Sequence, residues 1–256
     1  MWAASDTFSI DAGRIRIRSN TPETAAVVRA VLGDRLVDDD LEGDFAYSVR
    51  LEAPVRGTQP LHVLFEDCRV VRRTRDPVRL LAALVAHVQG RDELTAPGPV
   101  RVAGCAVVGR RGVALLPMQL EPDLSRIERR LNAAGMQNVD VPYLTFDALT
   151  GELLVPEPPA IDPAVLDGLD VYRGTEPGPA PAGRHRVSGW LLDDLRGADD
   201  IRRPALKLVL NHEAITRERA RRVIGKIQDN ATLIARWYPW PEDLVSAVVR
   251  LAEGRR

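Results

Sequence analysis

The sequence predicts an α/β protein, in which an α+β lobe at residues 1–90 is followed by an α/β core at residues 100–256. Segments with the alternating or continuous apolar pattern of strands recur in both parts, and segments with helical periodicity lie between them. The composition is that of a folded globular protein, since 45% of the 256 residues are hydrophobic and 28% are charged. The chain is therefore long enough for one large core or two modest cores.

The N-terminal lobe is expected to begin with a β-hairpin, because residues 7–19 alternate apolar and polar side chains around a turn that contains Gly13. A helix follows, with Thr21 as its N-cap and Pro22 in its first turn. Asp76 has the same role for a second helix, whose apolar residues repeat at helical spacing. Between the two helices, strands are expected at residues 45–51, 61–65 and 69–73.

The core is predicted to follow a linker at residues 91–99, which contains the sequence Pro-Gly-Pro. A strand, a helix and a strand in that order indicate a βαβ unit near its beginning. The expected elements are strands at residues 101–108 and 113–116, a helix at 123–134 and a strand at 138–146.

The C-terminal part contains a Pro-, Gly- and Asp-rich segment at residues 156–183. It is too long for a simple connection, so we interpret it as a surface excursion with a helical island at 163–169. Asn211 is predicted as a helix N-cap, because His212 and Glu213 lack the second histidine of a metal-binding HExxH pattern. The remaining expected elements are a strand at residues 187–192, a helix at 213–227, an extended segment at 232–238 and a helix at 242–253.

Charge and cysteine content exclude several classes of protein. A net charge of −1 gives no general attraction to nucleic acid or to an anionic membrane. Cys68 and Cys105 are too few for a disulfide framework and lack the spacing of a metal site. The N-terminus lacks the pattern of a signal peptide, and no segment has the length and hydropathy of a membrane span. We therefore expect a cytoplasmic protein with no bound metal or cofactor.

Five stretches carry a resemblance to a known family: FSIDAGRIRIRS at residues 8–19, VAGCAVV at 102–108, GVALLP at 112–117, GMQNVDVPYLTFDALTG at 135–151 and ARWYPWPEDLVSAVVRLAEG at 235–254. Their order resembles that of the bacterial HPr-kinase-like proteins. This family is related to phosphoenolpyruvate carboxykinase and includes small serine-kinase homologues near peptide natural-product genes. The resemblance covers most of the chain and implies a P-loop-kinase-like α/β core of the HPr kinase/PEP carboxykinase type.

The chain departs from this family where phosphate would bind. The family has a glycine-rich loop with a lysine and a serine or threonine, whereas the glycine positions here hold Met118, Glu121 and Asp123. Leu124 stands at the lysine position, and Ser125 is retained. The positions of the family's acidic pair and of its strand histidine hold other residues, namely Val141, Pro142 and Ala103. The resemblance therefore implies that the residues for phosphate, metal and base are missing.

The degenerate loop, residues 118–125, also opposes phosphate binding on physical grounds. Glu121 and Asp123 place carboxylates beside a helix N-terminus that would otherwise attract an anion. A phosphate about 5 Å from one of them would meet a repulsion of about 3 kcal/mol per unit charge at an effective dielectric constant near 20. Pro122 has no N–H to donate. We therefore expect this loop to reject the phosphates of ATP.

The resemblance and its losses together favour a pseudokinase, a catalytically inactive HPr-kinase-like protein that binds a protein or peptide partner. The resemblance also implies a setting in bacterial peptide natural-product biosynthesis. Candidate partner-binding residues form a basic ridge and an aromatic group: Arg126, Arg129, Arg130, Trp237 and Trp240. Such a ridge is more often a solvated helix face, and such aromatic residues more often pack in a core.

Two other functions stay open at the level of sequence. One is a divergent enzyme on the same fold, with Asp140 and Asp147 as the acids of a new site near the arginine ridge. The other is an atypical serine kinase for a peptide or small molecule, which would need an unusual phosphate-binding loop. A homo-oligomer is compatible with each of these functions.

Overall fold

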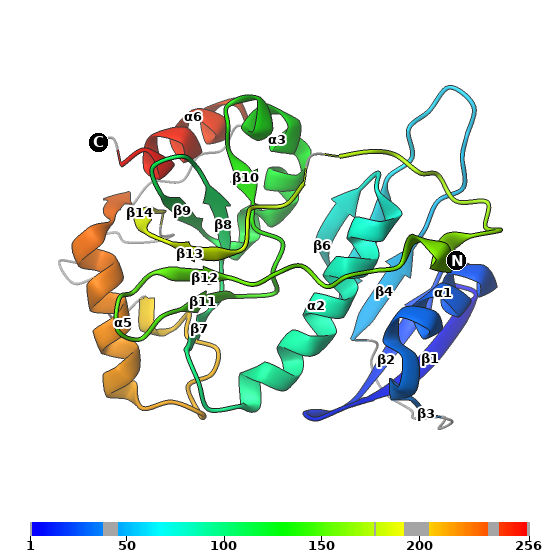
Figure 1. Cartoon of the computed structure of the whole chain (residues 1–256), viewed down its shortest axis with the longest axis horizontal. Coiled ribbons are helices and arrows are strands. Elements are labelled where there is room, and N and C mark those ends of the chain that lie inside the picture. The colour runs from blue at the N-terminus through cyan, green and yellow to red at the C-terminus, as the bar shows by residue number, and fades with distance from the viewer. Residues whose placement is uncertain (1, 38–45, 177, 192–204, 235–240, 255–256) are drawn as a thin grey trace. The chain divides into compact units, whose positions relative to one another are not determined.

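The computed structural model describes residues 2–37, 46–176, 178–191, 205–234 and 241–254 (Figure 1). Over these residues the chain is mixed α/β, with three β-sheets and five α-helices, so the predicted α/β class is confirmed. The chain divides into two compact units. The first consists of Met1–Asp92 and Pro158–Glu176, and the second of Glu93–Glu157 and Pro177–Arg256.

The first unit is built on a six-stranded sheet of order β3-β1-β2-β4-β5-β6. Strands β2 and β4 are parallel, and the other neighbouring strands are antiparallel. Alternate residues such as Ile17 and Tyr47 are buried with the apolar residues of α1 and α2 in one core. Its elements are β1 (Ala4–Ile10), β2 (Gly13–Ser19), α1 (Pro22–Leu32), η1 (Gly33–Arg35), β3 (Leu36–Val37), β4 (Tyr47–Arg50), β5 (His62–Glu66), β6 (Arg69–Thr74) and α2 (Pro77–Thr95).

Local sequence signals determine the start of these elements. Gly13 has a φ of 130°, a conformation that favours glycine, in the turn between β1 and β2. The Thr21 side chain accepts a hydrogen bond from the Thr24 N–H at 3.0 Å and so caps α1. The Asp76 carboxylate accepts one from the Val78 N–H at 3.0 Å at the start of α2. The predicted hairpin and both predicted N-caps are confirmed.

Part of the segment interpreted as an excursion returns to the first unit. We call residues 158–176 the returning segment. It contains the short 3₁₀-helix η3 (Pro163–Leu166), and the side chain of Leu166 is 1% exposed within the first core. Further along, the Tyr172 N–H donates to the Glu52 carbonyl at 2.8 Å. The helical island predicted at 163–169 is thus a single 3₁₀ turn.

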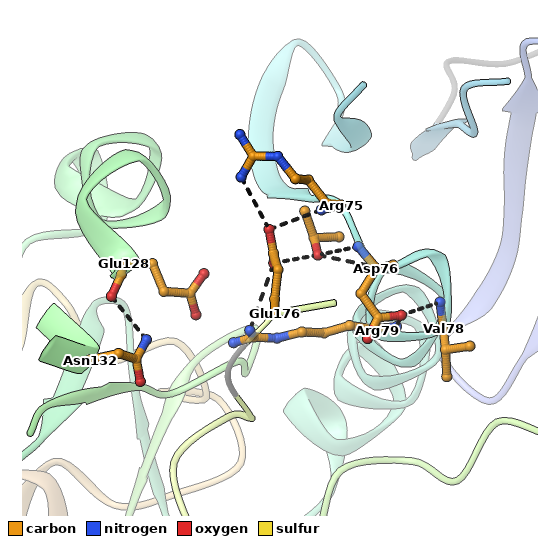
Figure 2. Close-up of polar contacts among 8 residues, drawn as sticks. Arg75, Asp76, Val78, Arg79, Glu128, Asn132 and Glu176 are labelled. Atoms are coloured by element: carbon orange, nitrogen blue, oxygen red, sulfur yellow. Dashed lines mark hydrogen bonds and ion pairs between the residues drawn. The ribbon is translucent and has the colours of Figure 1, made fainter. Parts of the chain in front are cut away.

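The end of the returning segment is held by a buried carboxylate (Figure 2). Glu176, whose side chain is 8% exposed, accepts hydrogen bonds from the Thr74 hydroxyl at 2.6 Å and from the Arg75 N–H at 2.9 Å. The guanidinium groups of Arg75 and Arg79 lie 3.9 and 3.8 Å from its oxygens. These contacts join the returning segment to the end of β6 and the first turn of α2.

The second unit contains two sheets. A five-stranded sheet has the order β10-β8-β9-β14-β15, and a four-stranded antiparallel sheet has the order β13-β12-β11-β7. The elements are β7 (Val100–Val102), β8 (Cys105–Val108), β9 (Val113–Leu116), η2 (Met118–Leu120), α3 (Glu121–Ala133), β10 (Gln137–Asn138), β11 (Leu144–Phe146), β12 (Leu153–Val155), β13 (Gly183–His185), β14 (Val187–Leu191), α5 (Arg217–Asn230), β15 (Thr232–Ile234) and α6 (Pro241–Ala252).

Two predicted strands are each divided between these sheets. The strand expected at 101–108 separates at Gly104 into β7 and β8, and the strand expected at 138–146 separates into β10 and β11. At Gly104 a Cβ atom would lie 3.0 Å from the Leu116 carbonyl oxygen and 3.1 Å from Leu144 Cδ1. Glycine therefore permits a close approach of strands where the chain changes sheets.

The βαβ unit expected from the sequence is present. Strands β8 and β9 are antiparallel and β10 is antiparallel to β8, so β10 runs parallel to β9 with β8 between them. Helix α3 connects β9 to β10, while β14, α5 and β15 form a second βαβ unit with adjacent parallel strands. One face of the five-stranded sheet packs against α3 and α6, and the other packs against α5 and the four-stranded sheet.

The predicted helix at 213–227 begins later than expected. Helix α5 starts at Arg217, and the Thr216 side chain caps it. Asn211, predicted as the cap, is instead 2% exposed; its side chain accepts from the Arg101 N–H at 3.0 Å and donates to the Pro99 carbonyl at 2.9 Å. The prediction that Asn211 caps a helix was wrong, because the local sequence cannot show that its side-chain amide binds the backbone of the distant strand β7. Within the described part of the chain, no helix combines the length and the apolar character that crossing a membrane requires.

Candidate functional site

The candidate site lies where the five-stranded sheet changes its direction of winding. From β9 the chain crosses through α3 to β10 on one side, and from β14 it crosses through α5 to β15 on the other side. Since β9 and β14 are adjacent and parallel, their carboxyl ends form a topological switch point. Open α/β sheets bind ligands at such a point.

A cavity of about 250 Å³ lies at this switch point. Its walls come from the ends of β7, β9 and β14 and from the turn that follows β9. The lining consists of residues 115–119 together with Val102, Ala103, Leu144, Trp190, Leu191 and Leu208. Among the described residues of the lining, Gln119 is polar and the other side chains are apolar, so none of these eleven residues is charged.

The strands that form the cavity are held rigidly. Leu115, Leu116 and Trp190 are 1%, 1% and 3% exposed, so they belong both to the wall and to the cores behind it. The Ala103 N–H donates to the Leu208 carbonyl at 2.7 Å, which fixes the opposite wall. After β9, Pro117 opens a 3₁₀ turn in which its carbonyl accepts from the Leu120 N–H at 3.0 Å.

The degenerate loop, residues 118–125, forms this 3₁₀ turn and the start of α3. Met118 lines the cavity, whereas Ser125 is partly buried on α3. Glu121 and Asp123 lie in the first turn of α3, which begins at Glu121 and not at the predicted Asp123. Leu124, at the position expected for lysine, is fully buried in the core between the sheet and α3.

The basic ridge lies on the exposed side of α3. Arg126, Arg129 and Arg130 are all exposed, and the Arg126 guanidinium lies 3.5 Å from the Asp123 carboxylate one turn earlier. The aromatic residues Trp237 and Trp240 lie outside the described residues. The structure therefore places the ridge on the helix that follows the cavity, and the cavity lining contains none of its three arginines.

One of the two acids proposed for a divergent enzyme, Asp147, is held in a turn. Asp147 accepts hydrogen bonds from the Thr150 and Leu149 N–H groups, both at 2.8 Å, and these bonds lower the pKa of its carboxyl group. Arg184 lies 3.1 Å from the same carboxylate. Asp147 thus holds the turn between β11 and β12, and the partners described for it lie outside α3. Asp140 is partly buried in the segment after β10.

The residues at the positions of the family's strand histidine and acidic pair are divided between the cavity and the core. Ala103, at the position of the family's strand histidine, lines the cavity beside Met118. Val141 and Pro142 follow β10 and are partly buried, and Val141 packs against the larger core of the second unit. The fold therefore brings Ala103 and Met118 into one site, although 15 residues of sequence separate them.

One polar cluster of the second unit was not expected from the sequence. The Tyr143 hydroxyl donates to the Glu93 carboxylate at 2.7 Å, and the buried Arg101 lies 3.5 Å from the same carboxylate. Burial, followed by the contact with Glu93, raises the pKa of Tyr143 well above its usual range. This keeps the hydroxyl protonated as a donor, so the cluster fastens the start of β7. Among the described residues, no group of three or more His, Cys, Asp or Glu side chains is placed to hold a metal ion.

Comparisons of the chain with protein-family models, with curated proteins and with solved structures give no match. The resemblance to the HPr-kinase-like family therefore stays a prediction from the sequence. The cavity residues Leu144, Trp190 and Leu208 were not predicted, because apolar residues in strands carry no local signal that distinguishes a cavity wall from a filled core.

Proposed function

We propose that this protein is a non-catalytic relative of the HPr-kinase-like proteins, a pseudokinase that binds a protein or peptide. The observation that carries the proposal is the burial of Leu124 at the position where the family has its phosphate-binding lysine. A lysine acts on a phosphate as a mobile positive charge, and a leucine fixed in the core cannot take over that role.

The surroundings of the switch point support the same function. The cavity there has apolar walls, and Glu121 and Asp123 follow it in the first turn of α3. Transfer of a polyanionic phosphate chain from water to such a place is strongly unfavourable without paired positive charges. An apolar group of a binding partner would be favoured at the same place, because its transfer from water is favourable.

The divergent-enzyme alternative has less support from the geometry. The carboxylate of Asp147 is engaged by two backbone N–H groups, by the Thr150 hydroxyl and by Arg184. A general base at neutral pH needs a pKa near that pH, whereas these contacts lower the pKa of Asp147. Asp147 is therefore better explained as the residue that closes the β11–β12 turn.

Calorimetric titration of the full chain with Mg-ATP tests the proposal. We expect no binding at micromolar to millimolar nucleotide. Micromolar binding of one nucleotide per chain would overturn the pseudokinase hypothesis. If such binding were weakened by Ser125→Ala and left unchanged by Arg56→Ala, at an exposed position of the first unit, the retained serine would be shown to bind the phosphates.

A second measurement separates a binding protein from an enzyme with a new site. A partner that co-purifies with the tagged chain from its host should, after separate purification, re-form a complex of fixed stoichiometry with it. Turnover of a small metabolite by the isolated chain would contradict the proposal.

A further inference from the structure

We infer that the cavity at the carboxyl ends of β9 and β14 receives a single uncharged apolar side chain of a bound peptide, whose neighbouring amide group binds Gln119. This inference rests on the proposed function, since it names the place and the chemistry of the partner contact. It concerns the cavity of about 250 Å³ bounded by Ala103, Met118 and Trp190.

The size of the cavity selects the occupant. Pockets for drug-sized ligands and cofactors have volumes of about 300–1,000 Å³. The cavity is smaller than this range, so a nucleotide or a large cofactor does not fit within it. A volume of about 250 Å³ suits one aliphatic or aromatic side chain.

The chemistry of the walls excludes charged groups. Ten of the eleven described lining residues have apolar side chains, and these offer no partner to a buried carboxylate or ammonium group. Met118 adds an unbranched and polarisable side chain that adapts to apolar groups of different shape and makes favourable contacts with aromatic rings. The site should therefore accept leucine-like and phenylalanine-like groups and reject acidic ones.

Gln119 distinguishes a peptide from a free apolar molecule. Gln119 is exposed, and among the described lining residues it is the one with a polar side chain. A carboxamide offers both a donor and an acceptor, which are the groups that a peptide unit needs. When an apolar side chain of a peptide enters the cavity, the backbone amide of the same residue would lie near Gln119. A free hydrocarbon has no group that could form a hydrogen bond with this carboxamide.

The walls are those of a built site at a functional position. The Ala103–Leu208 hydrogen bond holds the end of β7 against the segment that contains Leu208, and the close approach at Gly104 holds it against β9. At Gly189 in β14 a Cβ atom would lie 2.5 Å from Leu251 Cδ2, so this strand is also held close to its neighbour α6. The cavity therefore lies between rigid strands at the edge where α/β sheets bind their ligands.

Ligand-observed NMR with capped amino acids tests this inference on the full chain. N-acetyl-leucinamide and N-acetyl-phenylalaninamide should bind about ten- to hundredfold more tightly than N-acetyl-glycinamide, which has the same amides without the side chain. The capped amide of glutamate should show no binding above that of the glycine probe. Equal binding of all four probes would overturn the inference.

Variants locate the binding. Ala103→Leu, which fills the cavity, should remove the preference for the leucine probe, while Arg56→Ala, at an exposed position of the first unit, should keep it. Met118→Phe, at a partly exposed position, serves the same purpose if Ala103→Leu lowers the yield of folded protein. Gln119→Ala should weaken binding of the leucine probe several-fold. It should leave the binding of isopentanol, which has an apolar chain but no amide group, unchanged. Binding of the leucine probe to both filled variants would place it elsewhere and overturn the inference.

The result is independent of the nucleotide titration. Failure of the probes to bind, with ATP also unbound, would overturn the cavity assignment and leave the pseudokinase proposal standing. Micromolar ATP binding that Ala103→Leu abolishes would overturn both, because the site would then be a nucleotide site.

Discussion

Removal of the Glu176 carboxylate should release the end of the returning segment (Figure 2). In Glu176→Ala, the hydrogen bonds from the Thr74 hydroxyl at 2.6 Å and the Arg75 N–H at 2.9 Å are lost, together with the buried ion pair to Arg79. A hydrogen bond to a charged group contributes about 1.5–3 kcal/mol, and loss of one partner of a buried pair costs about 3–5 kcal/mol. We therefore expect a local destabilisation of about 3–5 kcal/mol. Glu176→Gln keeps one acceptor and should lose about 1–2 kcal/mol.

Hydrogen exchange measured by mass spectrometry is the suitable assay, because a chain with two units need not unfold in a single transition. The amides of Tyr172 and Gly174 donate to Glu52 and Arg75 and should be protected in the parent protein. In Glu176→Ala they should exchange more than a hundredfold faster, since each 1.36 kcal/mol is a factor of ten. The exposed Glu157 provides the matched control, because Glu157→Ala should change exchange less than twofold. Exchange in Glu176→Ala within threefold of the parent would refute this role of the carboxylate.

Two further predictions concern buried groups. Burial lowers the pKa of His62, whose Nε2 lies 2.8 Å from the Tyr172 carbonyl oxygen. The unfolded chain then binds the proton more tightly, so stability is complete above about pH 6.5 and falls on acidification by at most about 1.4 kcal/mol per pH unit. Urea unfolding from pH 5 to 8 should show this dependence of the free energy of unfolding on pH, and His62→Gln should reduce it. Equal slopes for the parent protein and the variant would contradict the role of His62. Gly104→Ala should destabilise the second unit by about 1–3 kcal/mol in urea, because its Cβ would lie 3.0 Å from the Leu116 carbonyl oxygen. Gly225→Ala in α5, with open space around the new atom, should instead stabilise it by about 0.5–1 kcal/mol, and the same sign for both would be evidence against the packing argument.

Signals that act over a few residues were readable from the sequence. The turn at Gly13 and the caps at Thr21 and Asp76 depend on groups within three residues of each other, so the turn of the hairpin and the starts of α1 and α2 lie where they were predicted. The helix predicted at 123–134 is likewise present as α3. The sequence also shows that the degenerate loop carries the acidic residues Glu121 and Asp123 where the HPr-kinase-like pattern has glycines.

Choices that depend on distant partners were not readable. A continuous apolar stretch at 101–108 has the same pattern whether it forms one strand or two, and the close approach of Leu116 and Leu144 to Gly104 decides for two. Asn211 has the composition of an N-cap, yet Arg101 and Pro99, which lie more than 100 residues earlier, engage its side chain. The cavity also depends on distant partners, since Ala103, Leu116 and Trp190 meet only when β9 pairs with β14 and the end of β7, from the other sheet, lies near them.

The sequence by itself determined the mixed α/β class, the local starts of helices and turns, and the absence of a lysine and glycines from the loop after β9. These properties follow from the conformational and charge preferences of adjacent residues. Only the tertiary structure decided that the chain changes sheets at Gly104, that residues 158–176 complete the first core, and that the degenerate loop borders an apolar cavity. The physical reason is that burial and close packing depend on which distant segments meet, and periodicity along the chain does not encode that pairing.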